Sequence, residues 1–310
     1  MPLYKLIFLT VLLAFVSCKE DRERVESDFK IADTGKIQSI EISSDYRAIQ
    51  KLEKKNNTWW LNDSLRVRPD AIENILRILP NIKVMFYPPR LAWENMLHAI
   101  QHEGVHLIIR DAGNRVLKDM RLGGSTNDER GTYAIIEGAK KPFVVQVPGF
   151  EGNLATRFIM DNIDWRDRMI IDENPDDIQK IKMTYPAQMS AGFTIEKTDA
   201  GYTLEDEHGK KLNSLTPMIN TYLSELSKIG CEAIVNDFKY KDTVFLDIPH
   251  AVLTLVIINQ PERTLKFYSN NLEGEADPER MFVYDGKDFY LAQIRILRKL
   301  FRPLGYFQVK

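Results

Sequence analysis

Val105-His106-Leu107-Ile108-Ile109 places apolar residues at alternate positions, and the same alternation returns in Leu253-Thr254-Leu255-Val256-Ile257. A period of two is typical of a β-strand with one buried face. Each stretch is followed by turn residues and a further apolar and basic run, at 111–118 and 259–266. The pattern therefore predicts a β-hairpin in each half of the chain.

A helix is predicted upstream of each hairpin, over residues 70–80 and 217–228. Both segments have an apolar stripe with a period of 3.6 residues, which is typical of a helix that buries one face. Pro69 and Pro217 lie at the helix starts, where the missing N–H is tolerated. The stripes consist of Ile72, Ile75, Leu76 and Leu79 in the first half and Ile219, Tyr222, Leu223 and Leu226 in the second.

Other segments repeat in the same order along the chain. Ile37, Ile40 and Ile42 have the spacing of Ile178, Ile181 and Met183, and Thr58–Leu61 matches Gly201–Leu204. We therefore predict an α+β fold of two similar lobes from an internal duplication, at 33–172 and 173–310. Each lobe is expected to hold an antiparallel or mixed sheet packed against one or two helices.

The N-terminus has the layout of a signal peptide: Lys5, a mainly apolar run over 6–16, then Ser17 and Cys18. The run is shorter than the ~20 apolar residues that a membrane-spanning helix needs. Phe15-Val16-Ser17-Cys18 resembles the lipobox of bacterial lipoproteins, which implies that 1–17 is removed and that Cys18 is acylated, with residues 18–32 as a tether. The alternative is an ordinary cleaved signal with an incidental cysteine.

Residues after Cys18 bear on the location of the protein. The second residue of the mature chain is Lys19 rather than Asp. By resemblance to lipoprotein sorting in two-membrane bacteria, this implies an outer-membrane rather than an inner-membrane lipoprotein of the cell envelope, periplasmic or surface-exposed. Lys19-Glu20-Asp21 also resembles a surface-export signal of lipoproteins in one bacterial phylum, and the alternative is a solvated charged tether. The membrane is thus the expected partner through lipid on Cys18.

Charge and cysteine content exclude some classes of function. The chain has 42 Lys and Arg against 44 Asp and Glu, a formal net charge of −2. It therefore lacks the excess of positive charge that is typical of nucleic-acid-binding proteins. With Cys18 acylated, Cys231 has no partner for a disulfide within the chain, and we expect it to be a small buried apolar side chain.

Three further segments carry a family resemblance: Asp33-Thr34-Gly35-Lys36-Ile37, Trp60-Leu61-Asn62 and Asp164-Trp165-Arg166-Asp167-Arg168. Together they resemble a large bacterial family of unknown function, with a duplicated α+β domain. That family occurs in lipoproteins and in an accessory subunit of a gliding-associated ABC transporter. The resemblance implies a location and a fold and carries no catalytic residues.

The densest group of metal-ligating residue types is His98, His102 and His106, spaced by four. On a helix His98 and His102 share a face and could bind zinc. Gly104 is expected to end the helix, so His106 should point elsewhere, and the segment lacks the order His-Glu-x-x-His. We therefore expect no metal, with His98 and His102 as the weak candidates, and no other cofactor.

Other motifs favour structural roles. Leu122–Asn127 lacks the Lys and the following helix of a phosphate-binding loop and is expected to be a wide hairpin turn. Trp59 and Trp60 should face opposite sides of a strand, and an exposed one beside Phe86 or Tyr87 would suit a binding surface. No nucleophile elbow occurs in the sequence.

The sequence thus predicts a lipid-anchored envelope protein that is not an enzyme. It is expected to act as a binding or scaffolding module, with an unidentified envelope protein as its partner, as an accessory to an envelope or transport complex. The alternative is an envelope hydrolase that uses a metal or a pair of carboxylates.

Overall fold

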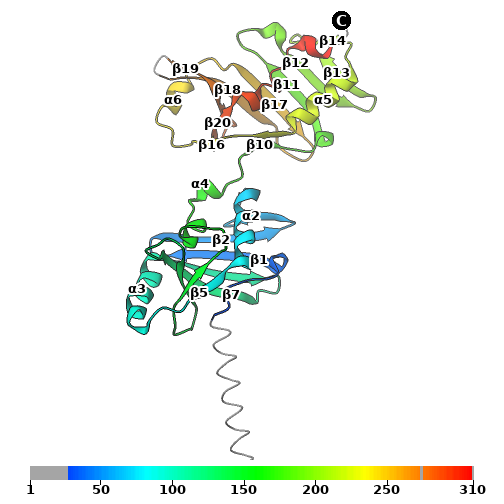
Figure 1. Cartoon of the computed structure of the whole chain (residues 1–310). Coiled ribbons are helices and arrows are strands. Elements are labelled where there is room, and N and C mark those ends of the chain that lie inside the picture. The colour runs from blue at the N-terminus through cyan, green and yellow to red at the C-terminus, as the bar shows by residue number, and fades with distance from the viewer. Residues whose placement is uncertain (1–26, 273–274, 309–310) are drawn as a thin grey trace, which may run out of the picture. The chain divides into compact units, whose positions relative to one another are not determined.

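The computed structural model describes residues 27–272 and 275–308. The predicted signal peptide at 1–17 and Cys18 lie outside these described residues. The chain divides into two compact units, Met1–Asp167 (unit 1) and Arg168–Lys310 (unit 2), both drawn in Figure 1.

The predicted α+β fold class is wrong. Strands hold 41% of the described residues and helices 24%, and most of the strand residues belong to two antiparallel sheets of nine strands each. Neighbouring strands are mostly joined by short turns, and antiparallel neighbours need no crossover helix. The helices are therefore few and short, and the protein is mainly β.

Unit 1 is one sheet with the order β4-β3-β2-β1-β6-β7-β8-β9-β5. Its strands are β1 (Ile37–Ser44), β2 (Arg47–Lys55), β3 (Thr58–Leu61), β4 (Leu65–Arg66), β5 (Lys83–Phe86), β6 (Val105–Asp111), β7 (Val116–Ser125), β8 (Thr132–Ile136) and β9 (Phe143–Gln146). Its helices are α2 (Pro69–Ile78), α3 (Trp93–Glu103) and α4 (Asn162–Trp165), with 3-10 turns at Thr34–Lys36, Leu79–Asn81, Arg90–Ala92 and Leu154–Arg157.

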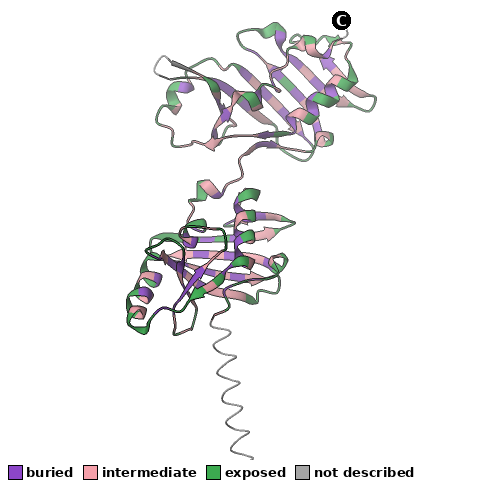
Figure 2. Cartoon of the chain, in the orientation of Figure 1, coloured by how far each residue is buried: buried purple, intermediate pink, exposed green. Residues whose placement is uncertain are grey.

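One face of the first sheet packs against α2. The helix begins with Pro69 at its first turn, and it buries Ile72, Ile75 and Ile78 against inward strand residues such as Ile40 and Leu107. Figure 2 shows buried residues alternating with residues of intermediate exposure along the strands, as the period of two requires.

The last residues of the predicted tether belong to this core. Phe29 and Ile31 are buried, the Phe29 ring packs edge-on against Phe143, and the Ile31 N–H donates to the carbonyl of Leu79. The folded part of unit 1 therefore includes residues that the sequence assigned to the tether, because an isolated Phe and Ile in a charged stretch give no periodic signal.

The opposite face of the first sheet carries α3. The helix ends at Gly104, as predicted, and there a Cβ would lie 2.4 Å from the Ile100 carbonyl oxygen and 2.5 Å from that of Leu122. At Gly123 a Cβ would lie 2.9 Å from the Ile100 side chain. Two glycines therefore let Ile100 approach the sheet backbone, and the expected hairpin turn at Leu122–Asn127 is instead the end of β7 up to Ser125.

Trp165 lies near the C-terminal end of unit 1 and packs into its core. Its side chain is fully buried, and the indole N–H donates to Gln50 Oε1 over 3.1 Å. Its carbonyl accepts from the N–H of Arg68, the residue just before α2. The end of the unit is thus bonded to the start of its main helix.

Unit 2 has a nine-stranded sheet with the order β14-β13-β12-β11-β17-β18-β19-β20-β16, and β10 pairs with β15 separately. Its strands are β10 (Met169–Asp172), β11 (Ile178–Thr184), β12 (Phe193–Thr198), β13 (Gly201–Glu205), β14 (Lys211–Leu212), β15 (Lys228–Gly230), β16 (Ala233–Ile234), β17 (Ala251–Ile257), β18 (Arg263–Leu272), β19 (Glu275–Tyr284) and β20 (Phe289–Gln293). Its helices are α5 (Thr216–Leu226), α6 (Lys241–Val244) and α7 (Ile294–Leu297), with 3-10 turns at Pro175–Asp177, Met189–Ala191 and Leu304–Phe307.

The order of strands in unit 2 repeats that of unit 1 position by position. The helix α5 buries Ile219, Tyr222 and Leu223 as predicted. Phe307 takes the place of Trp165, since it is fully buried and its carbonyl accepts from the N–H of Leu215, the residue before α5. Each unit has its own main core of buried residues.

Strand pairing corrects the register of the two hairpins. Ile42 lies opposite Leu107 and Met183 lies opposite Leu253, so Leu107 corresponds to Leu253 and Val105 to Ala251. The sequence comparison had matched Val105 to Leu253. A shift by two residues keeps every side chain on the same face, so alternation alone cannot detect it.

The second face of the sheet in unit 2 is covered by an aromatic cluster in place of a long helix. Val244, Tyr268, Phe282 and Phe289 are buried there, with Phe238 and Phe245 packed against them. The Phe282 and Phe289 rings stack with centroids 4.9 Å apart. Cys231, elsewhere in unit 2, is half-buried and packs against the main core.

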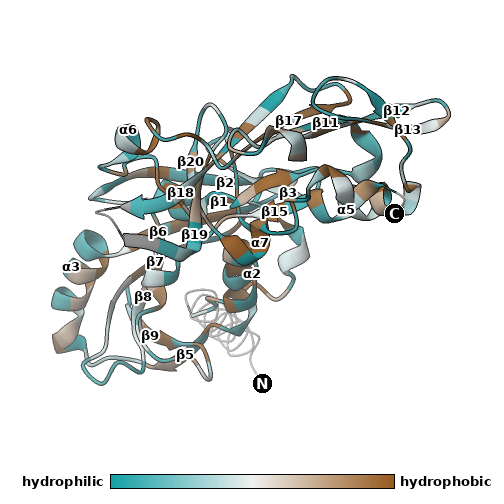
Figure 3. Ribbon diagram, turned by 90° about the horizontal axis from the view of Figure 1, so that it is seen from above, coloured by the Kyte–Doolittle hydropathy of each residue, from teal (hydrophilic) through white to brown (hydrophobic). Residues whose placement is uncertain are grey.

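Hydrophobic residues concentrate along the strands, as Figure 3 shows for β8, β9 and β5. Within the described part of the chain, no helix combines the length and apolar character needed to cross a lipid bilayer.

Candidate functional site

The two predicted metal candidates do lie together. His98 and His102 are on α3, and their ring centroids are 4.5 Å apart. The His102 Nδ1 atom is 3.2 Å from Asp45 Oδ2, and both side chains are about half exposed. Within the described residues, however, neither histidine belongs to a group of three or more ligating side chains that could hold a metal ion.

His106 belongs to a different group. It lies on β6 after the break at Gly104, and its Nε2 atom is 2.6 Å from Asp119 Oδ1 on β7 and 4.0 Å from Glu137 Oε2 after β8. The Arg121 guanidinium donates to the same Glu137 oxygen over 3.2 Å. The sequence could not bring these residues together, because their meeting depends on the register of three strands.

A cavity of about 620 Å³ adjoins this group. Both signs of charge line it, since Arg121 and Lys140 face it together with Glu137 and Asp45, and His102 lies at its wall. It can therefore accept a polar ligand through donors and acceptors at once.

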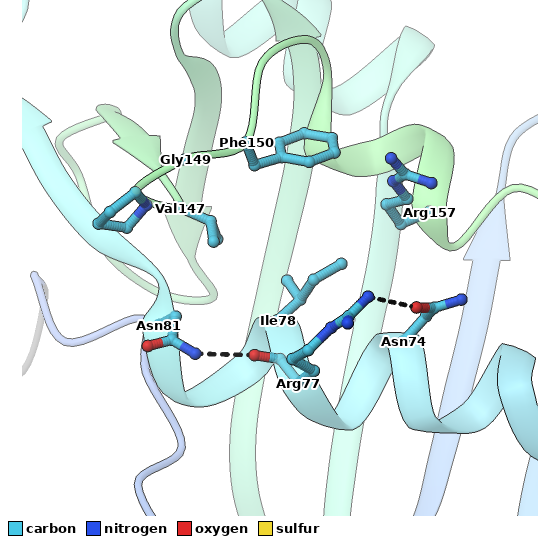
Figure 4. Close-up of a pocket in the computed structure, with 9 residues that line it drawn as sticks. Asn74, Arg77, Ile78, Asn81, Val147, Gly149, Phe150 and Arg157 are labelled. Atoms are coloured by element: carbon cyan, nitrogen blue, oxygen red, sulfur yellow. Dashed lines mark hydrogen bonds between the residues drawn. The ribbon is translucent and has the colours of Figure 1, made fainter.

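A second cavity, of about 390 Å³, lies between the end of α2 and the segment after β9 (Figure 4). Arg77 and Arg157 both line it, and the Arg157 guanidinium lies over the Phe150 ring at 4.8 Å. Arg77 donates to Asn74 Oδ1, and Asn81 donates to the Arg77 carbonyl. Among the described residues, no carboxylate forms an ion pair with either arginine, so this cavity (the arginine pocket) suits an anionic group.

A third cavity, of about 500 Å³, lies at the other end of β5 and is mainly apolar. Phe86, Pro88, Met96, Tyr133 and Val144 line it, and Asp128 and Asn127 lie at its rim. Hydrogen bonds from the Thr126 hydroxyl and the Arg130 N–H lower the pKa of Asp128, so this rim keeps a negative charge. We call this cavity the apolar pocket.

The strand β5 connects the two pockets along a free edge of the sheet. Asn81 of the arginine pocket comes just before β5, and Phe86 of the apolar pocket is its last residue. At this end of β5, the side chains of Phe86 and Leu91 are exposed to solvent, that of Leu91 at 98%. The sequence predicts that one of Trp59 and Trp60 lies in the core and that an exposed one beside Phe86 or Tyr87 would suit a binding surface. Trp59 is 7% exposed and packs in the core, whereas Trp60 is half-buried on β3, near the edge of the sheet opposite to β5.

The other three edges of the two nine-stranded sheets are shorter. The strand β5 has four residues, whereas β4, β14 and β16 have two each. Short edge strands prevent unwanted pairing with other chains, and β5 is the longest edge strand of the two nine-stranded sheets.

Comparison with known proteins identifies a domain of unknown function and no activity. No curated protein and no solved structure matches the chain. The family model described as "Domain of unknown function (DUF4340)" matches residues 94–247, and no enzyme family is found. The matched range runs from α3 of unit 1 across the division into unit 2 up to the end of α6. A DUF4340 domain, a domain of unknown function, is therefore found at residues 94–247 of this chain.

Proposed function

We propose that this protein is a lipid-anchored envelope protein that binds an extended segment of another envelope protein along β5. The observation that carries the proposal is the free four-residue edge of β5, with an arginine pocket at one end and an apolar pocket at the other. An added strand gains main-chain hydrogen bonds from the edge, and pockets for its side chains give specificity.

The length of the edge limits the bound segment. Four residues at ~3.4 Å each give about 14 Å, which fits a partner strand of four to six residues. Successive side chains of that strand point to opposite faces of the sheet. The arginine pocket is bounded by α2 and the apolar pocket by α3, which cover opposite faces, so alternate side chains can reach the two pockets.

The charges define the chemistry of the partner. Arg77 and Arg157 favour an acidic side chain or a terminal carboxylate at the start of β5. At the other end, Phe86, Met96 and Tyr133 favour an apolar side chain, and the carboxylate of Asp128 disfavours an acidic one there. The preferred segment is thus apolar at one end and acidic at the other.

The anchor follows from the residues before the fold. Phe15-Val16-Ser17-Cys18 supports acylation of Cys18, and Lys19 supports an outer-membrane location, periplasmic or surface-exposed. A multiply acylated cysteine holds a protein firmly on a bilayer, since each buried methylene contributes about 0.8 kcal/mol. A tethered module with a free strand edge suits an accessory role in an envelope or transport complex.

Binding can be measured by fluorescence anisotropy with labelled peptides of alternating Val and Thr that carry Asp or Lys at one end. We expect the Asp peptide to bind the full chain in detergent at least about tenfold more tightly than the Lys peptide, a difference of about 1.4 kcal/mol. The double substitution Arg77→Glu with Arg157→Glu should remove that preference.

Matched surface substitutions test the site. Phe86→Asp with Leu91→Asp should abolish peptide binding, whereas Tyr46→Asp with Ile49→Asp, two other exposed apolar residues on the β1–β2 hairpin, should leave it unchanged. Equal effects of the two pairs would reject β5 as the site. The anchor is tested separately: if Cys18→Ala still leaves the protein in the membrane fraction after high-salt washing, the lipoprotein interpretation is wrong.

A further inference from the structure

The side chains of His106, Asp119 and Glu137 converge on the face of the first sheet that carries α3, apart from β5. One ligand atom from each residue lies within 4.8 Å of the other two. The side chains are 16%, 32% and 50% exposed, so the group is partly shielded and still open to solvent on one side. An imidazole with two carboxylates is a donor set that suits zinc and excludes magnesium or calcium, which prefer all-oxygen sites.

The distances are compatible with a bound ion. Zn–N and Zn–O bonds of ~2.1 Å at tetrahedral angles place neighbouring ligand atoms about 3.4 Å apart. His106 Nε2 is 2.6 Å from Asp119 Oδ1 and 4.0 Å from Glu137 Oε2, so the two separations lie on either side of that value. Each must change by less than about 1 Å, which rotation of a carboxylate can supply.

The fold itself does not require these residues. In unit 2, Val252 occupies the position of His106, because Thr184 pairs with Val252 as Ser43 pairs with His106. Thr264 likewise occupies the position of Asp119. The same sheet is therefore built elsewhere with ordinary strand-forming residues, so the cluster is specific to unit 1.

We propose that His106, Asp119 and Glu137 bind one divalent transition-metal ion, with Zn²⁺ as the best fit to the donors. Three protein ligands leave a fourth position open, which Glu137 places beside the cavity of about 620 Å³ that it lines with Arg121 and His102. Water or an anionic ligand group from that cavity can complete the coordination. This site is independent of the proposed binding along β5.

Arg121 modulates the site. Its guanidinium donates to Glu137 Oε2, the same oxygen that faces His106, and its positive charge opposes a second cation. The ion and Arg121 therefore compete for that oxygen. Arg121→Gln should strengthen Zn²⁺ binding, a result that a cluster of purely structural ion pairs would not give.

The test uses the full chain in detergent, stripped with a chelator and then dialysed against Zn²⁺ or Co²⁺. We expect about one zinc per chain by elemental analysis and a visible absorption band from four-coordinate Co²⁺. His106→Gln and Asp119→Asn should each weaken binding at least about tenfold. Both are near-isosteric, and thermal unfolding checks that the variants remain folded.

His98→Gln is the matched control, because His98 lies on α3 outside the cluster. It should leave the zinc content and the Co²⁺ spectrum unchanged. The proposal is overturned if the stripped chain takes up no stoichiometric zinc. It is also overturned if folded His106→Gln binds as tightly as the unmodified chain, or if His98→Gln removes the metal.

Discussion

Units 1 and 2 share the order of their nine-stranded sheets but differ in the covering of the second face. In unit 1, Gly123 lets Ile100 of α3 approach the strand. In unit 2 the corresponding residue is Tyr268, which packs in the aromatic cluster with Phe245. The same order of strands is thus covered on this face by a helix where the strand position is Gly123 and by an aromatic cluster where it is Tyr268.

The difference extends to the edges and the polar groups. Unit 1 has the longer free edge β5 and the His106 cluster, whereas unit 2 has a two-residue edge β16 and Val252 and Thr264 at the corresponding positions. The longer free edge and the ligating cluster thus both lie in unit 1, although unit 2 also has a cavity, of about 560 Å³, beside Tyr185 and Phe193. This pattern is typical of folds that keep a common sheet and vary the connecting segments.

The largest effect is expected when the closing residue of each unit is truncated. Trp165→Ala and Phe307→Ala each remove a fully buried aromatic side chain, at a cost of about 3–5 kcal/mol in the free energy of unfolding. All four tryptophans, at 59, 60, 93 and 165, lie in unit 1. In urea unfolding, tryptophan fluorescence should therefore follow unit 1, and far-ultraviolet circular dichroism should follow both units.

Because each unit has its own core, a substitution in one core should change the unfolding transition of that unit alone. Trp165→Ala should lower the midpoint of the fluorescence transition, whereas Phe307→Ala should leave that midpoint unchanged and shift part of the dichroism transition. If Phe307→Ala moves the fluorescence midpoint as much as Trp165→Ala does, the two units unfold as one and the comparison fails.

The next effect concerns the residue that differs between the second faces. Tyr268→Ala should destabilise unit 2 by about 3 kcal/mol, because it leaves a cavity among Phe245 and its neighbours. Gly123→Ala should destabilise unit 1 by about 1–3 kcal/mol, since the new Cβ meets Ile100 of α3. The same denaturant titrations measure both changes.

The clash between the new Cβ and Ile100 can be tested directly by combining Ile100→Ala with Gly123→Ala. Removal of the Ile100 side-chain atom that meets the new Cβ should recover part of the loss, which a double-mutant cycle would show as coupling. Additive effects would indicate that Gly123 is required for another reason.

The smallest effect concerns acid stability, which should be similar in the two units. The Arg115 N–H, with that of Gly113, lowers the pKa of Asp111 in unit 1, and the Lys210 N–H, with that of His208, lowers the pKa of Asp206 in unit 2. A lowered pKa stabilises the fold above the unfolded value of ~3.9, and this stabilisation is lost as the pH falls through the folded pKa. Asp111→Asn and Asp206→Asn should therefore reduce the slope of stability against pH below about 4, with the larger loss of stability at pH 7, where the carboxylates are ionised, and little loss at the lowest pH.

Thermal unfolding followed between pH 2 and 7 checks this expectation. A variant that loses the same stability at pH 7 as at low pH would show that the turn needs the side-chain geometry more than its charge.

The sequence by itself determined the local elements. The apolar stripes placed α2 and α5, Gly104 marked the end of α3, and the alternating residues placed the hairpins β6–β7 and β17–β18. These features depend on neighbours within a few residues, so composition and period are enough to show them. Lipidation of Cys18 and the envelope location remain predictions from the same kind of local signal.

Only the tertiary structure decided the fold class, the register and the candidate sites. The mainly β character follows from nine strands that pair edge to edge in each unit, and a shift of two residues between hairpins leaves the alternation unchanged. His106, Asp119 and Glu137 are separated in sequence and meet across three strands. Arg77 of α2 and Arg157 of the distant 3-10 turn at Leu154–Arg157 line one cavity. Such meetings depend on strand register and packing between segments far apart in the chain, which no local pattern records.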